Sequence, residues 1–584
     1  MRIAVLVKQI PRGEDLEMID GRLRRTSGDA EVNAFCRRAN AKAVELADGG
    51  EVVVFSMGPP GAEDALREMI ACGATRGVHL CNMDFAGSDT LATAKALAVA
   101  IVKEGSFDLV LCGLNSLDAD TGQVGPEVAE LLGFPFAVGA TTIEVRENEL
   151  KLTLETDEGF DSVEVCLPAV VSVTERLCDP SKADRLQRDS VERSKIKMYS
   201  AFDLGLRLSE TGQLGSPTTV GPPRQVMSNR VPFVTSSPSE AVSKLREIGA
   251  LGVSIFSSKE IVPEPGTGPM DVWCFLDPDL TSSRYELLGE AAHLASQING
   301  SVTAVVSGDL SDSLGAYGAD RILRLPGNDS DSWGHSLAQL ASIYLPRVLL
   351  VDGTRNGRTV ASKVAARHGW GLTGDGIETE ITSDGSLTVW KPALGGRVVV
   401  PIWSRSPVQI ATIRPGVIVP RTLRLDRELI EITDDTLEQS KTSRVRLLER
   451  VKLDTARRDL LAAQTVIGIG RGVDPTKYDT INLLKDIFQS AEIGASRKVT
   501  DAGWMPRSRQ LGITGLSVRP RLFISIGASG RFNHLSGFQT SQFIFALNSD
   551  SEAEIFQNAD VGLVGDWSDS LDKILPLMAD NISQ

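Results

Sequence analysis

Short apolar runs alternate with segments of helical spacing along most of this chain. Ile3–Val7, Glu51–Ser56 and Asp108–Cys112 are predicted strands, with Ala39–Leu46 and Thr90–Lys103 as helices between them. A strand that is apolar throughout must be covered on both faces, as in a parallel sheet with helices on either side. The sequence therefore predicts an α/β protein made of doubly wound parallel sheets.

The alternation is interrupted and then starts again, which predicts several domains. At 584 residues the chain is too long for one hydrophobic core. Gly, Ser and Pro accumulate from Asp203 to Pro223, and Ser257–Met270 has the composition of a linker. We predict three doubly wound parallel-sheet domains, at residues 1–198, 271–453 and 454–584, with an extended arm and interdomain linker over residues 199–270.

Charge and cysteine content exclude several classes of protein. The net charge of −15 argues against a nucleic-acid binder, which needs a basic face. The seven cysteines are scattered without a CxxC pair, so we predict free thiols and no metal site. The start, Met1–Lys8, has the pattern of a strand, and no apolar run approaches the roughly 18 residues of a membrane span. We expect a cytoplasmic protein without direct membrane insertion.

Polar and small residues follow the predicted strands of the last domain. Val466–Ile469 leads into a Gly-Arg-Gly turn, and Leu522–Ile526 leads into Gly-Ala-Ser-Gly. Nucleotides bind at this carboxyl edge of a parallel sheet, where backbone N–H groups can approach phosphates. We predict a Rossmann-like nucleotide site. The polar residues expected there are Arg471, Ser496, Arg497, Gln510, Thr514, Ser529, His534, Asn548 and Asp566.

Several of these residues also have an ordinary structural interpretation. His534 is one of five histidines and could be a buried side chain bonded to backbone. Arg497 could form a surface salt bridge, and Asp566 could be a helix N-cap.

Residues 454–584 resemble the FAD-binding domain of the electron transfer flavoprotein α subunit. The matching stretches are IGIGRGV, GASRKVTDAGW, QLGITG, ISIGASGRFNHLSG, FALNSD and ADVGLVGDW. The resemblance implies roles for individual positions. Arg471 and Ser496 would bind the pyrophosphate or ribityl region, with Ser529 and Gly530 nearby. Arg497 would lie over the flavin ring, and His534 would bond to its pyrimidine carbonyl.

The same resemblance implies that Thr514 bonds to flavin N5, within the motif that runs from Gln510 to Gly515. Asn548 and Asp566 would hold the adenosine end. One position departs from the family, since Ile513 stands where Gln is frequent. This departure affects the expected flavin potentials more than the expected binding.

The rest of the chain resembles the other parts of the same family. Residues 271–420 resemble the N-terminal domain of the α subunit, through RYELLGEAAHLA and NGRTVASKVAARHGWGLTGD. Residues 1–223 resemble the β subunit, through VKQIP, SDTLATAKALA and LPAVVSVTE. The chain therefore resembles β and α subunits fused in that order.

A second nucleotide site is predicted in the β-like part. Gly113–Pro126 follows a buried strand and opens a helix, and in the family this segment binds AMP or a second FAD. The pattern favours FAD, although Ala34 replaces a usual proline. The residues concerned are Asp89, Thr90, Asp118, Asp120, Thr121, Gln123, Val124 and Gly125.

The resemblance implies three functional hypotheses. The chain could carry electrons from flavin dehydrogenases, such as acyl-CoA dehydrogenases in fatty acid β-oxidation, to a membrane quinone oxidoreductase. It could instead bifurcate electrons, oxidising NADH at a second FAD, or be a nucleotide-binding module without electron transfer. For partner docking we single out Leu186, in the charged loop Cys178–Arg193. A solvated charged loop is the alternative interpretation.

Overall fold

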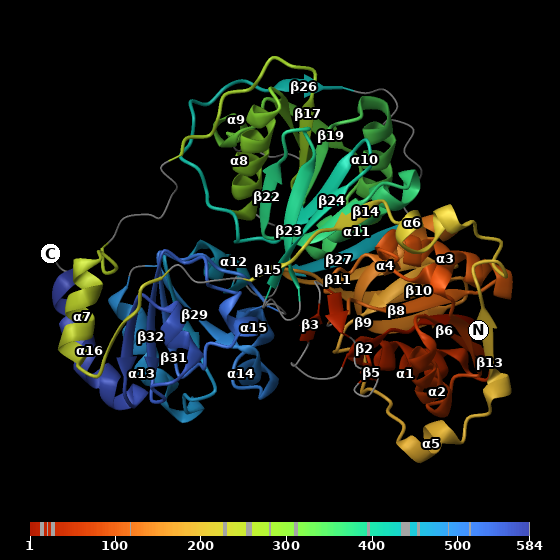
Figure 1. The fold of residues 1–584 in the computed structure, drawn as a ribbon, viewed down its shortest axis with the longest axis horizontal. Helices are drawn as coiled ribbons and strands as arrows, with labels where there is room; N and C mark the ends of the chain where they lie inside the picture. The colour runs from red at the N-terminus through yellow and green to blue at the C-terminus, as the bar shows by residue number, and fades with distance from the viewer. Residues whose placement is uncertain are drawn as a thin grey trace.

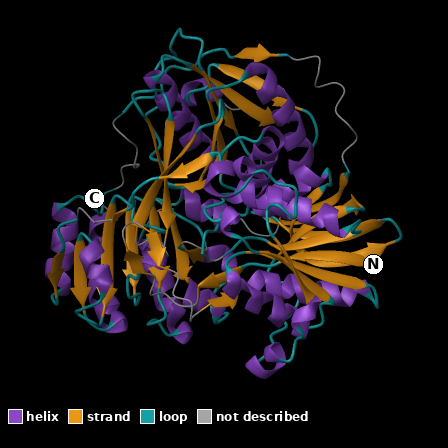
Figure 2. Cartoon of the chain, turned by 45° about the vertical axis from the view of Figure 1, so that its right-hand side comes forward, coloured by secondary structure: helices purple, strands orange, loops and turns teal. Residues whose placement is uncertain are grey.

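The computed structural model describes residues 1–11, 17–19, 22–24, 30–116, 118–225, 230–252, 260–278, 282–308, 313–393, 398–433, 444–452, 456–488, 490–512 and 515–582. Three large sheets form three lobes, which we call the first unit (residues 1–199), the second unit (271–433) and the C-terminal unit (456–582) (Figure 1). Helices lie on both faces of the sheets (Figure 2). The predicted α/β fold class with several parallel sheets is confirmed.

The first unit is built on a ten-stranded sheet of order β13-β7-β6-β1-β8-β12-β9-β10-β11-β27, parallel from β13 to β9 and antiparallel beyond. Its strands are β1 Arg2–Leu6, β6 Glu51–Met57, β7 Arg76–Leu80, β8 Leu109–Gly113, β9 Phe136–Arg146, β10 Glu149–Glu155, β11 Gly159–Cys166, β12 Ala169–Val173, β13 Ile196–Tyr199 and β27 Val445–Lys452. Its helices are α1 Ala34–Ala47, α2 Glu63–Ala71, α3 Thr90–Glu104, α4 Val124–Leu132 and α5 Arg185–Asp189.

Alternation along the central strand explains why helices cover both faces. Ile3 and Val5 pack in one core with α1 and α2, whereas Ala4 and Leu6 pack in the other core with α3 and α4. Both faces of β1 are therefore buried, as its continuous apolar run predicts.

The second unit contains a parallel sheet of order β21-β25-β20-β17-β18-β19-β26 and an antiparallel sheet of order β14-β24-β23-β22. Its strands are β17 Asp271–Phe275, β18 Ser301–Ser307, β19 Arg321–Leu325, β20 Val348–Asp352, β21 Leu372–Gly376, β22 Glu378–Ile381, β23 Leu387–Ala393, β24 Val398–Ser404, β25 Gln409–Ile413 and β26 Ile430–Ile432. Its helices are α8 Ser282–Gln297, α9 Leu314–Tyr317, α10 Ser330–Tyr344 and α11 Arg355–His368.

The C-terminal unit contains a parallel sheet of order β16-β33-β32-β31-β28-β29-β30. Its strands are β28 Thr465–Ile469, β29 Ala491–Ser496, β30 Gln510–Leu511, β31 Leu522–Ile526, β32 Phe543–Asn548 and β33 Val561–Val564. Its helices are α12 Ala456–Ala462, α13 Tyr478–Ile487, α14 Arg497–Asp501, α15 Phe532–Leu535 and α16 Trp567–Ile582, with a short 3-10 helix η8 Arg507–Arg509.

The arm between the first two units adds strands to a sheet of the second unit and to the sheet of the C-terminal unit. β14 Thr218–Val220 and β15 Arg224–Gln225 pair with β24 of the second unit. β16 Phe233–Thr235 pairs with β33, and α7 Pro238–Glu247 packs beside α16 (Figure 1). In the other direction, β27 follows the second unit in sequence and pairs with β11 of the first. The units are therefore interlocked by strands, and the predicted domain boundaries stay a prediction.

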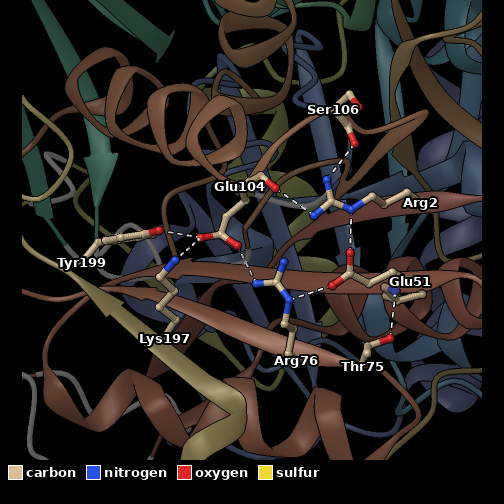
Figure 3. Close-up of polar contacts among 9 residues, drawn as sticks. Arg2, Glu51, Thr75, Arg76, Glu104, Ser106, Lys197 and Tyr199 are labelled. Carbon is tan, nitrogen blue, oxygen red and sulfur yellow. Dashed lines mark hydrogen bonds and ion pairs between the residues drawn. The ribbon is translucent and has the colours of Figure 1, made fainter.

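At the amino edge of the first sheet, charged residues pair with one another (Figure 3). Arg2 and Arg76 each donate to Glu51, at 2.6 and 2.7 Å. Arg76 also donates to Glu104 at 2.7 Å, and Tyr199 donates to the same carboxylate at 2.6 Å. This network fastens the edge strand β13 to the sheet. It lies opposite the carboxyl edge, where the predicted nucleotide residues lie.

Among the described helices, none combines the length and the apolar composition that a membrane crossing requires.

Candidate functional site

The parallel strands of the C-terminal sheet all end along one edge. Because β28, β29, β31 and β32 run in the same direction, the loops that follow them are neighbours. This edge and its loops and helix starts carry Arg471, Ser496, Arg497, Gln510, Gly515, Ser529, Gly530, His534, Asn548 and Asp566. Thr514 and Ile513 lie outside the described residues.

Glycines bring the loops of this edge into contact. A Cβ on Gly470 would lie 2.2 Å from the carbonyl oxygen of Gly527, so only glycine fits where the loops after β28 and β31 meet. Gly530 has a φ of 78°, and a Cβ there would lie 2.3 Å from Cα of Ile555. These two contacts fix the path of the loop that carries Ser529.

His534 has one satisfied and one unsatisfied ring nitrogen. Nδ1 lies 3.3 Å from the carbonyl oxygen of Leu511, which can only accept, so Nδ1 carries the proton. Nε2 is buried without a hydrogen-bond partner among the described residues. Burial lowers the pKa of His534 to about 4, although the Leu511 carbonyl opposes this shift. The ring is therefore neutral at physiological pH and directs a lone pair from Nε2.

Three predicted residues have side chains without a partner among the described residues. Arg471 and Ser529 are exposed, and Ser496 is half-buried. Ser496 is the N-cap residue of α14, yet its hydroxyl makes no capping bond. A guanidinium and two hydroxyl donors along one edge are suited to phosphate oxygens.

The side chains of two other predicted residues form hydrogen bonds within the chain. Asn548 donates from Nδ2 to the Ala528 carbonyl at 2.8 Å and accepts from the backbone N–H of Asp550 at 3.0 Å. Asp566 accepts from the backbone N–H groups of Ser568 and Asp569, at 2.9 and 3.2 Å, and so caps α16. Asn548 thus braces the loop before Ser529, and Asp566 has the N-cap role that is its ordinary interpretation.

A cavity of about 720 Å³ adjoins this edge, and all three units line it. The first unit contributes residues such as Asn115 and Asp157, and the second contributes Arg355. From the C-terminal unit come Arg497, Gln510 and Gly515, among others. A cavity of this size is large enough for a cofactor.

Arg497 and Gln510 line this cavity, and each side chain is bonded within the chain. Arg497 donates from Nε to Asp501 at 3.2 Å, and both side chains of this pair are nearly half exposed. Gln510 is buried and accepts a bond of 2.7 Å from the Thr500 hydroxyl. Because its pair is a weak surface interaction, Arg497 can turn toward an anionic group at little cost.

At the predicted second site, the side chains around the start of α3 are bonded within the chain. Asp89 caps α3 by accepting from the backbone N–H of Ala92 at 2.9 Å, and its other oxygen accepts from the Thr218 hydroxyl at 2.7 Å. Thr90 lies 2.8 Å from Oε1 of Gln123 and 3.1 Å from Oε1 of Glu127.

The Thr90 hydroxyl has one proton for these two contacts. Burial raises the pKa of Glu127 well above its usual range, while the hydrogen bond that the Thr90 hydroxyl donates opposes the shift. The hydroxyl can donate to only one of the two oxygens at a time. Nε2 of Gln123 and Oε2 of Glu127 have no hydrogen-bond partner among the described residues.

The loop before α4 is covered by the second unit. Lys8 pairs with Asp118 at 2.8 Å, and Asn115 donates to Asp120. The backbone carbonyl of Asp120 accepts from Arg358 on α11 at 3.2 Å. Burial raises the pKa of Asp120, while Arg358 opposes the shift. Thr121 and Val124 are half-buried and Gly125 is buried, at the point where α4 begins.

Leu186 lies on α5, and its exposed fraction is 80%. Asp184 caps this helix, accepting from the backbone N–H of Gln187 at 2.9 Å. The structure thus presents one large apolar side chain on a short, capped and charged helix.

Several cavity residues have no sequence motif that would identify them. Asp157 lies in the turn between β10 and β11, and Glu175 follows β12. Their partners, Arg457 and Arg507, are more than 280 positions further along the chain. Only the assembled fold brings these acids and arginines together.

Comparison with known families gives matches in both halves of the chain. Residues 21–198 and 278–444 match the model of the electron transfer flavoprotein domain. Residues 459–539 match that of the electron transfer flavoprotein FAD-binding domain.

Curated relatives cover about half of this chain. Electron transfer flavoprotein subunit alpha of Thermoanaerobacterium thermosaccharolyticum is 33% identical over 332 residues, 54% of this chain and 98% of that protein. Acryloyl-CoA reductase electron transfer subunit beta of Anaerotignum propionicum is 28% identical, over 54% and 96%. Lactate dehydrogenase (NAD(+),ferredoxin) subunit LctC of Acetobacterium woodii is 30% identical, over 50% and 72%.

Proposed function

This chain belongs to the electron transfer flavoprotein family and carries its FAD-binding domain, and from this we propose that it takes electrons from flavin dehydrogenases of the acyl-CoA dehydrogenase type and passes them to a membrane quinone oxidoreductase. We further propose a fusion: a β-like part and arm over residues 1–198 and 199–270, then α-like domains over 271–453 and 454–584. The two separate matches to one domain support the fusion.

The observation that carries the proposal is the carboxyl edge of the C-terminal sheet. Arg471, Ser496 and Ser529 have polar groups without partners among the described residues, and His534 has a buried nitrogen in the same condition. The buried Nε2 of His534 is costly without a partner, so a ligand that supplies one is favoured there, and the exposed or half-buried donors along the same edge are accessible to that ligand. These residues therefore fit a phosphate-containing cofactor with a polar ring.

FAD, when bound, would supply the electron-transfer chemistry, because its ring can be reduced and reoxidised. In our proposal Arg471, Ser496, Ser529 and the turn at Gly530 bind its phosphates and ribityl chain. Arg497, Gln510, Thr514 and Gly515 surround the ring. Asn548 and Asp566 act indirectly at the adenosine end, because their side chains brace the loops there.

Binding of the cofactor would change the pKa of His534. Leu511 holds the proton on Nδ1, so Nε2 can donate to a carbonyl oxygen only if it gains a second proton. A partner that accepts at Nε2, or that becomes negative, therefore raises the pKa of His534 from about 4.

For the flavin dehydrogenase we propose a contact through Leu186. An apolar side chain that is 80% exposed on a capped helix is a suitable anchor for a partner pocket. We expect Leu186→Ala to slow electron uptake from the dehydrogenase, measured by stopped-flow, and to leave the flavin spectrum unchanged. An unaltered rate would remove this helix from the proposal.

The alternative function is electron bifurcation, with NADH oxidised at a second FAD in the first unit. The name of the lactate dehydrogenase relative, which includes NAD(+) and ferredoxin, favours this alternative. The segment from Asp118 to Gly125 would hold the second nucleotide, FAD or AMP. Because Asp89 and Thr90 are bonded within the chain, we propose that main-chain N–H groups at the start of α4 hold the phosphates.

Counting nucleotides tests both functions. The protein is reconstituted with excess FAD, denatured, and its released nucleotides are quantified. We expect two FAD per chain and no AMP. One FAD with one AMP leaves the carrier and excludes bifurcation, whereas no FAD contradicts the proposal for the C-terminal unit. Because two FAD alone do not establish bifurcation, anaerobic bleaching by NADH is the second measurement.

A further inference from the structure

A single carboxylate contacts all three units of the molecule. Asp157 belongs to the first unit, in the turn between β10 and β11. Its Oδ2 accepts a hydrogen bond of 3.0 Å from the backbone N–H of Arg355, the first residue of α11 in the second unit. Its Oδ1 lies 3.0 Å from Nη1 of Arg457, on α12 of the C-terminal unit.

The environment of Asp157 keeps it ionised. Its side chain is only 9% exposed. Burial raises its pKa, but the charges of Arg457 and Arg355 and the backbone bond outweigh burial, so the pKa is lower than usual. Asp157 therefore holds a full negative charge between two units, in a region where charges are poorly screened by water.

The contact with Arg457 lies beside the predicted flavin site. Asp157, Arg355 and Arg457 line the same cavity as Arg497 and Gln510. Helix α12, which carries Arg457, packs against η8, and η8 leads directly into β30 and Gln510. A displacement of α12 relative to the first unit therefore displaces the wall of the cavity.

A second bridge joins the same two units but is more exposed. Glu175 of the first unit pairs with Arg507 of η8, with side-chain exposures of 20% and 42%. Arg507 also pairs with Asp501 at 3.0 Å within its own unit. An exposed, shared pair of this kind contributes little to orientation. The carboxylate of Asp157 is buried, and among the described residues no second acid pairs with Arg457.

We propose that Asp157 is a positioning residue that fixes the C-terminal unit over the cavity, with one oxygen on α11 and the other on Arg457. It acts on the flavin through α12 and η8, which carry Arg457 and lead into Gln510. This inference rests on the proposed FAD function for its spectroscopic consequence, whereas its mechanical consequence stands on the two contacts alone.

The test uses the full chain with FAD and compares Asp157→Asn with the parent protein. Removing the charge of one partner of a buried pair is costly, so amide hydrogen exchange in α12 is expected to rise about tenfold or more. The visible circular dichroism of bound FAD is expected to change, while the amount of FAD bound does not. Asp157→Glu restores the charge and should recover much of the parent spectrum.

Asp161→Asn is the matched control. Asp161 lies on the same hairpin, is similarly buried and makes bonds of 2.8 and 2.9 Å to Arg450. Its partner is on β27 of the first sheet, so loss of this pair should leave α12 exchange and the flavin spectrum unchanged.

Arg457→Gln removes the ion pair with Asp157 by changing its other partner. This variant replaces Asp157→Asn in the test if Asp157→Asn does not fold. Arg457→Gln should raise amide exchange in α12 about as much as Asp157→Asn does. The variant that carries both substitutions should raise it little further. Unchanged exchange in Arg457→Gln, or equal effects of Asp161→Asn, would overturn the proposal. Failure of the parent protein to bind FAD would instead contradict the proposed function, and the exchange comparison would still decide the role of Asp157.

Discussion

Two edges of this molecule carry glycine-containing turns between a parallel strand and a helix, and their polar side chains differ. At the C-terminal edge, Arg471 and Ser529 are exposed, and His534 has a buried nitrogen without a partner among the described residues. At the edge of the first sheet, Asp89 caps α3 and binds Thr218, and Thr90 bonds to two side chains.

The second unit packs against the first edge, yet both edges reach the same cavity. The helix that follows the first-unit turn, α4, packs against α11 of the second unit, and Arg358 reaches the Asp120 carbonyl. Both edges line the cavity, the first through Asn115 and Gly122 and the C-terminal one through Arg497 and Gln510. The two edges therefore differ in how their side chains are bonded, and not in access to the cavity. The first-unit segment can bind a phosphate mainly through its backbone, whereas the C-terminal edge also offers side chains.

The largest expected effect comes from Gly530, on the C-terminal edge. In Gly530→Ala the new Cβ would meet backbone 2.3 Å away, at a φ of 78°. We expect a loss of at least about 3 kcal/mol in the free energy of unfolding, and loss of FAD binding. Denaturant titration and FAD reconstitution measure the two effects.

Gly122→Ala is the corresponding change at the first edge. Gly122 has a φ of 64°, but a Cβ there meets its nearest atom only at 3.4 Å. The expected cost is therefore about 1 kcal/mol, from backbone strain alone. An equal cost for the two variants would show that the two turns are constrained alike.

The next effect is the pH dependence of His534. Its pKa is lowered to about 4 in the folded chain, from an ordinary value of 6.5. The unfolded chain therefore binds more protons between these values, and stability is lost as the pH falls through this window. Without FAD we expect a loss of about 2 kcal/mol between pH 7 and pH 4 from this residue.

His534→Gln should flatten this part of the pH profile, which is measured by denaturant titration of the FAD-free protein. His293 offers a control, since it is only half-buried on α8 and its Nε2 lies 3.0 Å from Nε2 of Gln297. His293→Gln should leave the profile unchanged. A parent protein whose stability is flat from pH 7 to pH 4 would contradict the assignment of a buried neutral ring.

The sequence was sufficient to predict the parallel sheets and their carboxyl edges, but not the antiparallel strands β10, β11 and β22 to β24. Continuous apolar runs such as Ile3–Val7 are strands covered on both faces, and Gly470 and Gly527 are where the strand-end turns meet. These features depend on neighbours in sequence, so a local pattern reveals them.

The partners of the polar side chains could not be predicted in this way. Nothing near Thr90 indicates that Gln123 and Glu127 will surround its hydroxyl, and nothing near Asp157 indicates Arg457. Such pairs form only when separate units meet. Local sequence also could not predict that β16 pairs with β33 of the C-terminal unit, or that β27 pairs with β11 of the first unit.

A smaller effect tests the closed side-chain network of the first edge. Thr90→Val removes the hydroxyl between Gln123 and Glu127, leaving two buried polar groups with one bond fewer. We expect a loss of about 1–2 kcal/mol in the free energy of unfolding. If the backbone holds the second nucleotide, Thr90→Val will release as much of it per chain on denaturation as the parent protein does.

Thr93→Val is the control on the same helix. Its hydroxyl donates only to the backbone carbonyl of Asp89, at 2.7 Å, so its loss should cost less than that of Thr90. A second nucleotide lost only in Thr90→Val would show that side chains bind at this edge, which would remove the contrast with the C-terminal edge.

The smallest effect on stability is expected at Arg497. Its pair with Asp501 is nearly half exposed, so Arg497→Ala should change the free energy of unfolding by less than about 1 kcal/mol. Its effect on the cofactor is separate. A positive charge beside the flavin stabilises negative charge on it, so its loss should lower the flavin reduction potential. A shift of about 60 mV corresponds to a tenfold change in a one-electron equilibrium, and we expect no more than this from a half-exposed guanidinium.

Lys498→Ala provides the control for Arg497, because Lys498 is the next residue on α14, is also exposed, and does not line the cavity. Both variants remove one positive charge from the same helix. If Arg497 acts by facing the flavin, only its variant lowers the potential in a reductive titration. Equal shifts would mean that the helix contributes only its net charge. The C-terminal edge would then differ from the first edge in its exposed donors and in His534, but not in a cation directed at the ring.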